Sequence, residues 1–150
     1  MTYTLSFRTK HNYDTTKIAI TIPVELAYGT NFVQVDSKLD TGATFCIFER
    51  AYGEMLGLDV ESGTKMLVST PNSTFEAFGH WLTMTALGFQ FDAMLYFAAD
   101  QSIKRSVLGR RGFIDQLRIC LTSMTANCIP ASLMTSEREP SKAFSSSVPA

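Results

Sequence analysis

The alternation of apolar and polar residues along the chain predicts a series of β-strands. β-branched residues recur at every second position from 18 to 24, and a second alternating stretch runs from 32 to 39. Pro23 has no backbone N–H to donate, so the first strand should end there or lie at a sheet edge. The segment 27–31 has the small and polar residues of a turn and separates the two strands.

The middle of the chain predicts a β-hairpin. Segments 66–70 and 74–84 are expected to form its two arms, and Pro71, Asn72 and Ser73 supply the residues of the turn between them. Further strands are predicted at 43–48, 89–97 and 106–108, and the segment 118–121 is expected to end the ordered part.

Two stretches favour short helices rather than strands. They span 49–56, which Gly57 would end, and 110–117. Many short strands with few helices predict an all-β barrel or sandwich.

Composition divides the chain into three parts. Residues 1–16 are polar and are expected to be an N-terminal extension, irregular or a loose edge strand, before a domain spanning 17–129. The segment 130–150 is rich in Ser and Pro and has little to bury, so we expect it to be a disordered tail.

Charge and hydropathy restrict the classes of partner. The formal net charge of the 150 residues is −1 and no basic cluster stands out, so we expect no nucleic-acid partner. The longest apolar stretch, 86–99, contains Gln90 and Asp92 and is too short to cross a bilayer. Without an apolar targeting segment near its start, the chain is expected to be cytoplasmic and not to bind membranes.

The three cysteines indicate neither a disulfide framework nor a metal site. Cys46, Cys120 and Cys128 are odd in number and lack zinc-ligand spacing, and His11 and His80 are isolated in the sequence. We therefore expect buried free thiols and no metal or other cofactor.

The segment Asp40-Thr41-Gly42-Ala43 carries the chemistry of the sequence. It follows an apolar strand and is followed by more apolar residues. A carboxylate can hold or accept a proton, and a hydroxyl can form a hydrogen bond across an interface. A glycine lets a substrate or a second backbone approach closely.

With these flanking strands, Asp40-Thr41-Gly42-Ala43 resembles the active-site signature of retropepsin-like aspartic peptidases, of the non-viral cellular type. Val107 to Ile114, with Gly109 and Arg110, resembles the late apolar–apolar–Gly strand and short helix of that family. The hairpin tip at 71–73 corresponds to the flap that covers bound peptide. The resemblance covers about residues 17–121 and implies a closed β-barrel of the acid-protease type, with one short C-terminal helix.

The resemblance also implies a mechanism. Asp40 would be the catalytic carboxylate, supported by Thr41, Gly42 and Ala43. Two such carboxylates held together share one proton, so one member activates water and the other polarises the scissile carbonyl. The chain has a single Asp-Thr-Gly, so the resemblance implies a homodimer that cleaves peptide or protein substrates without a cofactor.

One departure from the family affects Arg110. Thr44 and Phe45 stand where many viral members have an acidic residue that would pair with this arginine. The alternative to a peptidase is therefore a non-catalytic module that binds a peptide or protein on the same fold. A blander alternative is a structural β-protein with a chance Asp-Thr-Gly.

Overall fold

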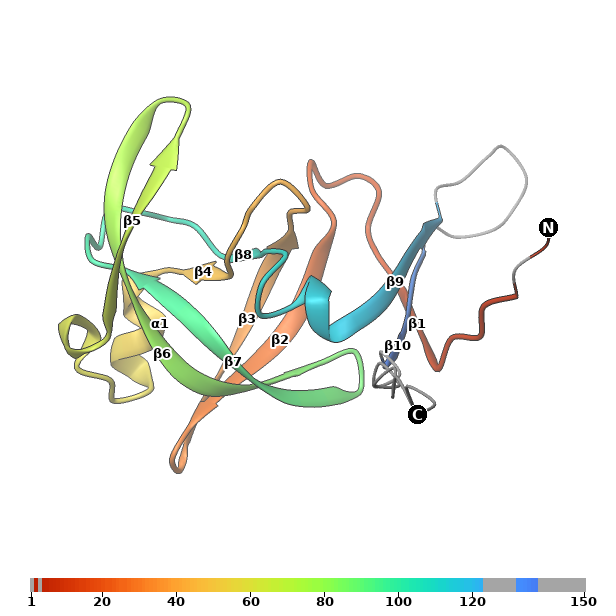
Figure 1. Cartoon of the computed structure of the whole chain (residues 1–150), viewed down its shortest axis with the longest axis horizontal. Helices are drawn as coiled ribbons and strands as arrows, with labels where there is room; N and C mark the ends of the chain where they lie inside the picture. The colour runs from red at the N-terminus through yellow and green to blue at the C-terminus, as the bar shows by residue number, and fades with distance from the viewer. Residues whose placement is uncertain (1, 3, 123–131, 138–150) are drawn as a thin grey trace, which may run out of the picture.

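The computed structural model describes residues 2, 4–122 and 132–137 (Figure 1). Its elements are mostly strands, with one short α-helix and two 3₁₀ turns. In chain order they are β1 (Thr9–Asn12), β2 (Thr21–Tyr28), β3 (Asn31–Leu39), β4 (Ile47–Phe48), α1 (Arg50–Met55), η1 (Val60–Ser62), β5 (Thr64–Thr70), β6 (Ser73–Ala86), β7 (Phe89–Ala98), β8 (Val107–Leu108), η2 (Ile114–Gln116), β9 (Leu117–Thr122) and β10 (Ser132–Glu137).

Six of the strands form a closed ring of hydrogen-bonded neighbours. The order is β2-β3-β8-β4-β7-β6, and β6 returns to β2 through the pairing of Val24–Ala27 with Thr83–Ala86. Strand β5 continues the sheet beyond β6 as the outer arm of a hairpin that rises from the ring (Figure 1). Pro23 pairs with β3 but lies outside the β2–β6 pairing, so it faces a free edge as predicted.

The interior of the ring is the main hydrophobic core. Strand β2 shows the expected alternation, with Ile22, Val24 and Leu26 fully buried between more exposed neighbours. Phe48 and Phe97 come from the parallel pair β4–β7 and lie in the same core. Each such side chain contributes about 1.5–3 kcal/mol relative to an exposed one.

A second sheet of three strands lies beside the ring, in the order β1-β10-β9 (Figure 1). The hydroxyls of Thr9 and Thr135 are hydrogen-bonded at 2.5 Å across the β1–β10 pair, and Thr135 is fully buried. The strand β10 falls in the segment predicted to be disordered. Composition is a poor guide there, because pairing with two neighbouring strands satisfies the backbone of β10 even where few apolar residues are available. The rest of that predicted tail, and Cys128, lie outside the described residues.

Two other predicted elements are shorter than expected. The predicted strand 43–48 is a strand only at Ile47–Phe48, because residue 43 still belongs to the turn after Asp40 and donates its N–H to the Asp40 carbonyl. The predicted helix 110–117 is reduced to the 3₁₀ turn η2 at Ile114–Gln116. The predicted short C-terminal helix is thus a 3₁₀ turn, and the short α-helix among the described residues is α1. The predicted helix 49–56 agrees with α1.

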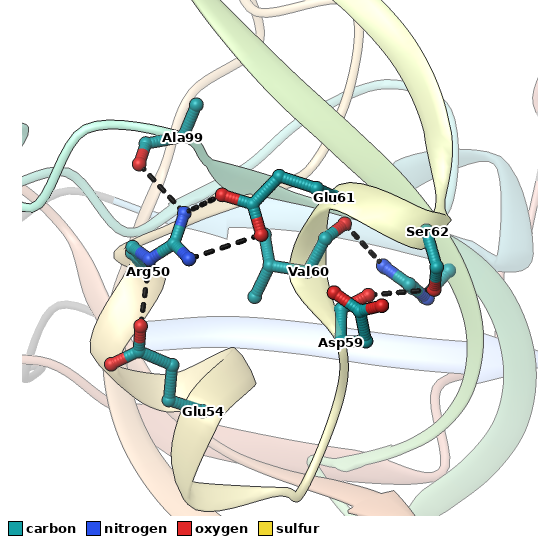
Figure 2. Close-up of polar contacts among 8 residues, drawn as sticks. Arg50, Glu54, Asp59, Val60, Glu61, Ser62 and Ala99 are labelled. Atoms are coloured by element: carbon teal, nitrogen blue, oxygen red, sulfur yellow. Dashed lines mark hydrogen bonds and ion pairs between the residues drawn. The ribbon is translucent and has the colours of Figure 1, made fainter.

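Arg50 fixes helix α1 to its surroundings (Figure 2). Its guanidinium donates to Glu54 one turn on (2.7 Å), to Glu61 in η1 and to the carbonyl of Ala99 after β7 (2.8 Å). The hydrogen bonds to Glu61 first and to Glu54 second raise the pKa of Arg50 above its usual value, and the hydrogen bond from Arg50 lowers the pKa of Glu61. The cluster therefore holds α1 and η1 against the end of β7.

No helix in the described part of the chain is long and apolar enough to span a membrane.

Candidate active site

Asp40 stands at the carboxyl end of β3, where the ring brings β8 alongside. Leu39 and Leu108 are partners in the parallel β3–β8 pair, and the backbone N–H of Asp40 donates to the Leu108 carbonyl at 3.0 Å. The alternation of β3 buries Val33, Val35 and Ser37 on one face and carries the chain straight to this edge. The backbone of Asp40 is therefore held in place by the neighbouring strand β8.

The loop after Asp40 folds back on the aspartate itself. The N–H of Gly42 donates to Asp40 Oδ1 (3.0 Å), and the N–H of Ala43 donates to the Asp40 carbonyl (3.1 Å). The side chain of Asp40 retains 24% of its exposure, with Arg105 Nη2 at 3.8 Å from Oδ2. Thr41 is exposed at the turn. One carboxylate oxygen is thus oriented by backbone, and the other faces a cation.

Gly109 is the point at which two backbone segments cross. A Cβ on this buried residue would lie 2.4 Å from the carbonyl oxygen of Phe45 and 2.9 Å from that of Ala43. Immediately after it, Arg110 and Arg111 donate backbone hydrogen bonds to the carbonyls of residues 43 and 44, at 2.9 and 2.8 Å. Only glycine allows this crossing, which fixes the segment after β8 to the loop that begins at Asp40.

Cys46 lies behind this crossing. Its sulfur accepts the N–H of Gly109 at 3.3 Å, and its thiol donates to the Arg111 carbonyl at 3.5 Å. Burial raises the pKa of the Cys46 thiol to about 12, so the group stays protonated at neutral pH and serves as packing rather than as a nucleophile.

Arg110 has a neutral partner. Its Nη2 donates to the hydroxyl of Thr44 at 3.1 Å. The sequence offers no ion pair here because Thr44 is not acidic, and a hydrogen bond occupies the same place between the loop and the segment after β8.

A cleft of about 530 Å³ separates the Asp40 loop from the hairpin. Residues from strand β5 and the turn after it form one wall of the cleft. The loop after Asp40 forms the other wall together with Arg105, which comes from the segment before β8. The lining comprises Asp40, Gly42, Ala43, Thr44, Phe45, Ile47, Met66, Leu67, Val68, Ser69, Thr70, Pro71 and Arg105. Apart from Asp40 and Arg105 every lining side chain is uncharged, so the cleft suits an extended, mainly apolar chain segment.

The hairpin tip is tighter than predicted. Thr70 and Ser73 are paired, which leaves a two-residue turn at Pro71 and Asn72. The Thr70 hydroxyl accepts the N–H of Ser73 at 3.1 Å and closes the turn. Pro71 fixes its own φ, and of the described residues only Leu87 is a non-glycine with positive φ, so this tip is built without strained backbone.

The structure brings most of the predicted site residues together. Asp40, Gly42, Ala43 and Pro71 line the cleft, whereas Asn72 and Ser73 lie at the exposed tip of the hairpin and Thr41 lies beside the cleft. Gly109 and Arg110 do not line the cleft, and they contact residues 43–45 of the loop that follows Asp40.

Sequence reasoning missed Arg105 as a lining residue. Its sequence position gave no signal, because Arg105 lies outside both the predicted strand 106–108 and the segment 107–114 that resembles the late strand and helix of the family. Among the residues with a described position, no three His, Cys, Asp or Glu side chains gather closely enough to hold a metal ion.

Comparison with solved structures identifies the fold. A retropepsin-like aspartic protease from Rickettsia conorii superposes with a TM-score of 0.59 at 14% identity, over 89% of this chain and 97% of that one. The chain has a retropepsin-like fold. The EIAV protease complexed with the inhibitor HBY-793 matches with a TM-score of 0.52 at 22% identity, over 67% of this chain and 88% of that one.

The retropepsin-like fold confirms the family resemblance that the sequence suggested, and its ring of strands agrees with the predicted all-β class. No protein-family model matches the sequence, and no curated protein is significantly similar to it. The likeness therefore concerns the fold, and the chemistry has to be argued from the residues of the cleft.

Proposed function

We propose that this protein is an aspartic endopeptidase that acts as a homodimer, with Asp40 from each subunit forming the catalytic pair. The observation that carries the proposal is the position of the Asp40 carboxylate in a cleft beneath a hairpin, with one oxygen held by the Gly42 N–H at 3.0 Å. Both solved structures named above are proteases.

The chemistry follows from two carboxylates in one site. Like charges a few ångströms apart do not both ionise, so the pair shares one proton. The ionised Asp40 takes a proton from water as the water attacks the scissile carbonyl, and the protonated Asp40 donates its hydrogen bond to the carbonyl oxygen. The pair titrates as a unit.

A second subunit is needed because the chain contains one Asp-Thr-Gly. A twofold axis beside the loop would bring two copies of Asp40 together. Thr41 and Gly42 are exposed there, and the Thr41 hydroxyl has no hydrogen-bond partner within the described chain, so it is free to bond across the axis. The hairpin of each subunit would cover an extended peptide and pair with its backbone.

The second candidate is a module on the same fold that binds an extended peptide without cleaving it. The contact between Arg105 and Asp40 favours it, since the guanidinium lies against an oxygen that the mechanism uses. Fold alone does not separate the two candidates.

The deciding experiment compares wild type with Asp40→Asn on a mixed peptide library from acidic to neutral pH. Asp36→Asn is the matched control, because Asp36 is an exposed carboxylate on the same strand β3. Analytical ultracentrifugation gives the dimer fraction in the same samples. We expect cleavage by wild type and Asp36→Asn only, in proportion to dimer. Cleavage by Asp40→Asn contradicts the mechanism, and an inactive wild-type dimer favours the binding module.

A further inference from the structure

Arg105 lies in the wall of the cleft, two residues before β8. Its side chain is 35% exposed, and its Nη2 is 3.8 Å from Asp40 Oδ2. That distance is too long for a hydrogen bond, so the contact is electrostatic and leaves the donors of the guanidinium available. The residue before it, Lys104, does not line the cleft, since its ammonium pairs with Glu49 at 3.4 Å and its side chain is 69% exposed. Arg105 is therefore a cleft residue and Lys104 is not.

The charge balance of the cleft depends on whether one subunit or two are present. In one subunit, Asp40 (−1) and Arg105 (+1) cancel, and the other lining residues are uncharged. In the proposed dimer the catalytic pair holds one proton and carries −1, while two Arg105 side chains carry +2, which gives +1. The walls are largely apolar, and charges act more strongly there than in water. The assembled cleft thus holds one guanidinium more than its carboxylates can neutralise.

We infer that Arg105 selects substrates that carry an acidic side chain next to the scissile bond. The inference rests on the proposed function and names its substrate class. A planar guanidinium with free donors binds a carboxylate through two parallel hydrogen bonds. Because Arg105 is 3.8 Å from the carboxylate that would flank the scissile carbonyl, the side chain it reaches belongs to a residue beside that bond rather than to a distant one.

The test uses one peptide that wild type cleaves, in three forms with Glu, Gln or Lys beside the scissile bond. Glu and Gln have the same shape, so their ratio of kcat/KM reports the carboxylate alone. We expect wild type to favour Glu over Gln roughly tenfold or more, and both over Lys. Arg105→Gln should abolish the difference, Arg105→Glu should reverse it in favour of Lys, and Arg105→Lys should keep its direction at reduced size. Lys104→Gln removes a neighbouring charge outside the cleft and should leave the Glu-to-Gln ratio unchanged.

A binding measurement separates this inference from the proposed function. Fluorescence anisotropy of the three labelled peptides is recorded with Asp40→Asn and with Asp40→Asn carrying Arg105→Gln. Tighter binding of the Glu peptide that disappears with Arg105→Gln supports acid selection whether or not wild type cleaves. Absence of cleavage would overturn the proposed function alone. Equal kcat/KM and equal binding for Glu and Gln peptides would overturn the role of Arg105, as would a Glu preference that survives Arg105→Gln.

Discussion

Gly109→Ala should destabilise the protein through a steric conflict between backbone segments. The added Cβ would lie 2.4 Å from the carbonyl oxygen of Phe45 and 2.6 Å from its carbonyl carbon. Non-bonded carbon contacts are favourable near 3.5–4.0 Å, so the two segments must separate by roughly 1 Å. The atoms that the Cβ would meet belong to the backbone of Phe45 and Ala43, so no side chain can rotate away to relieve the conflict.

The expected cost has two parts. Overpacking a dense region costs about 1–3 kcal/mol. Separation also stretches the hydrogen bonds from Arg110 and Arg111 to the carbonyls of residues 43 and 44, each worth about 0.5–1.5 kcal/mol. The free energy of unfolding should therefore fall by about 2–6 kcal/mol, a large share of the roughly 5–15 kcal/mol typical of a domain.

Urea unfolding at one fixed protein concentration measures this loss, because association would otherwise shift the midpoint. Gly29→Ala is the control. Gly29 has φ +59° but a Cβ added to it would meet nothing within 4 Å, so the cost of this substitution is conformational and about 1–2 kcal/mol. If Gly109→Ala lost no more stability than Gly29→Ala, the crossing would not be as tight as the distances require.

Two further predictions concern groups away from the cleft. Arg50→Met should lower the free energy of unfolding by about 1–2 kcal/mol, mostly through the lost hydrogen bond to the Ala99 carbonyl. Lys65→Met breaks an exposed ion pair with Glu76 and should change that free energy by less than about 0.5 kcal/mol in the same urea assay. Equal losses in the two variants would contradict the anchoring role of Arg50. Burial raises the pKa of the Cys46 thiol in the folded protein to about 12, above the usual 9.0. The contribution of this thiol to the free energy of unfolding is therefore fully present below pH 9, and it is lost between pH 9 and 12 as the thiol ionises in the unfolded chain. Stability should fall there by up to about 1.4 kcal/mol per pH unit from this group, and the fall should be shallower in Cys46→Ala; identical pH profiles of the two proteins would refute the assignment.

Local patterns were sufficient to predict the hairpin. The turn residues 71–73 between the segments 66–70 and 74–84 indicate two paired strands, as the structure has them. Gly109 was singled out by the family resemblance and not by a local pattern, and the structure gives the physical reason for a glycine there, which is the close approach of the Phe45 carbonyl.

The remaining features depend on tertiary pairing. Strand β10 owes its structure to two partner strands, which composition does not reveal. The two-residue strands β4 and β8 are too short to show a period. Arg105 reaches the cleft because the segment before β8 passes in front of Asp40, and that path is set by the closure of the ring rather than by neighbouring residues.

Subunit mixing tests the shared active site most directly. Wild type is exchanged with Asp40→Asn at constant total concentration, and peptide cleavage is followed as the wild-type fraction is varied. If each site needs Asp40 from both subunits, activity falls as the square of that fraction, to about a quarter in an equal mixture. A linear fall, to about half, would mean that one chain carries a complete site and would contradict the account.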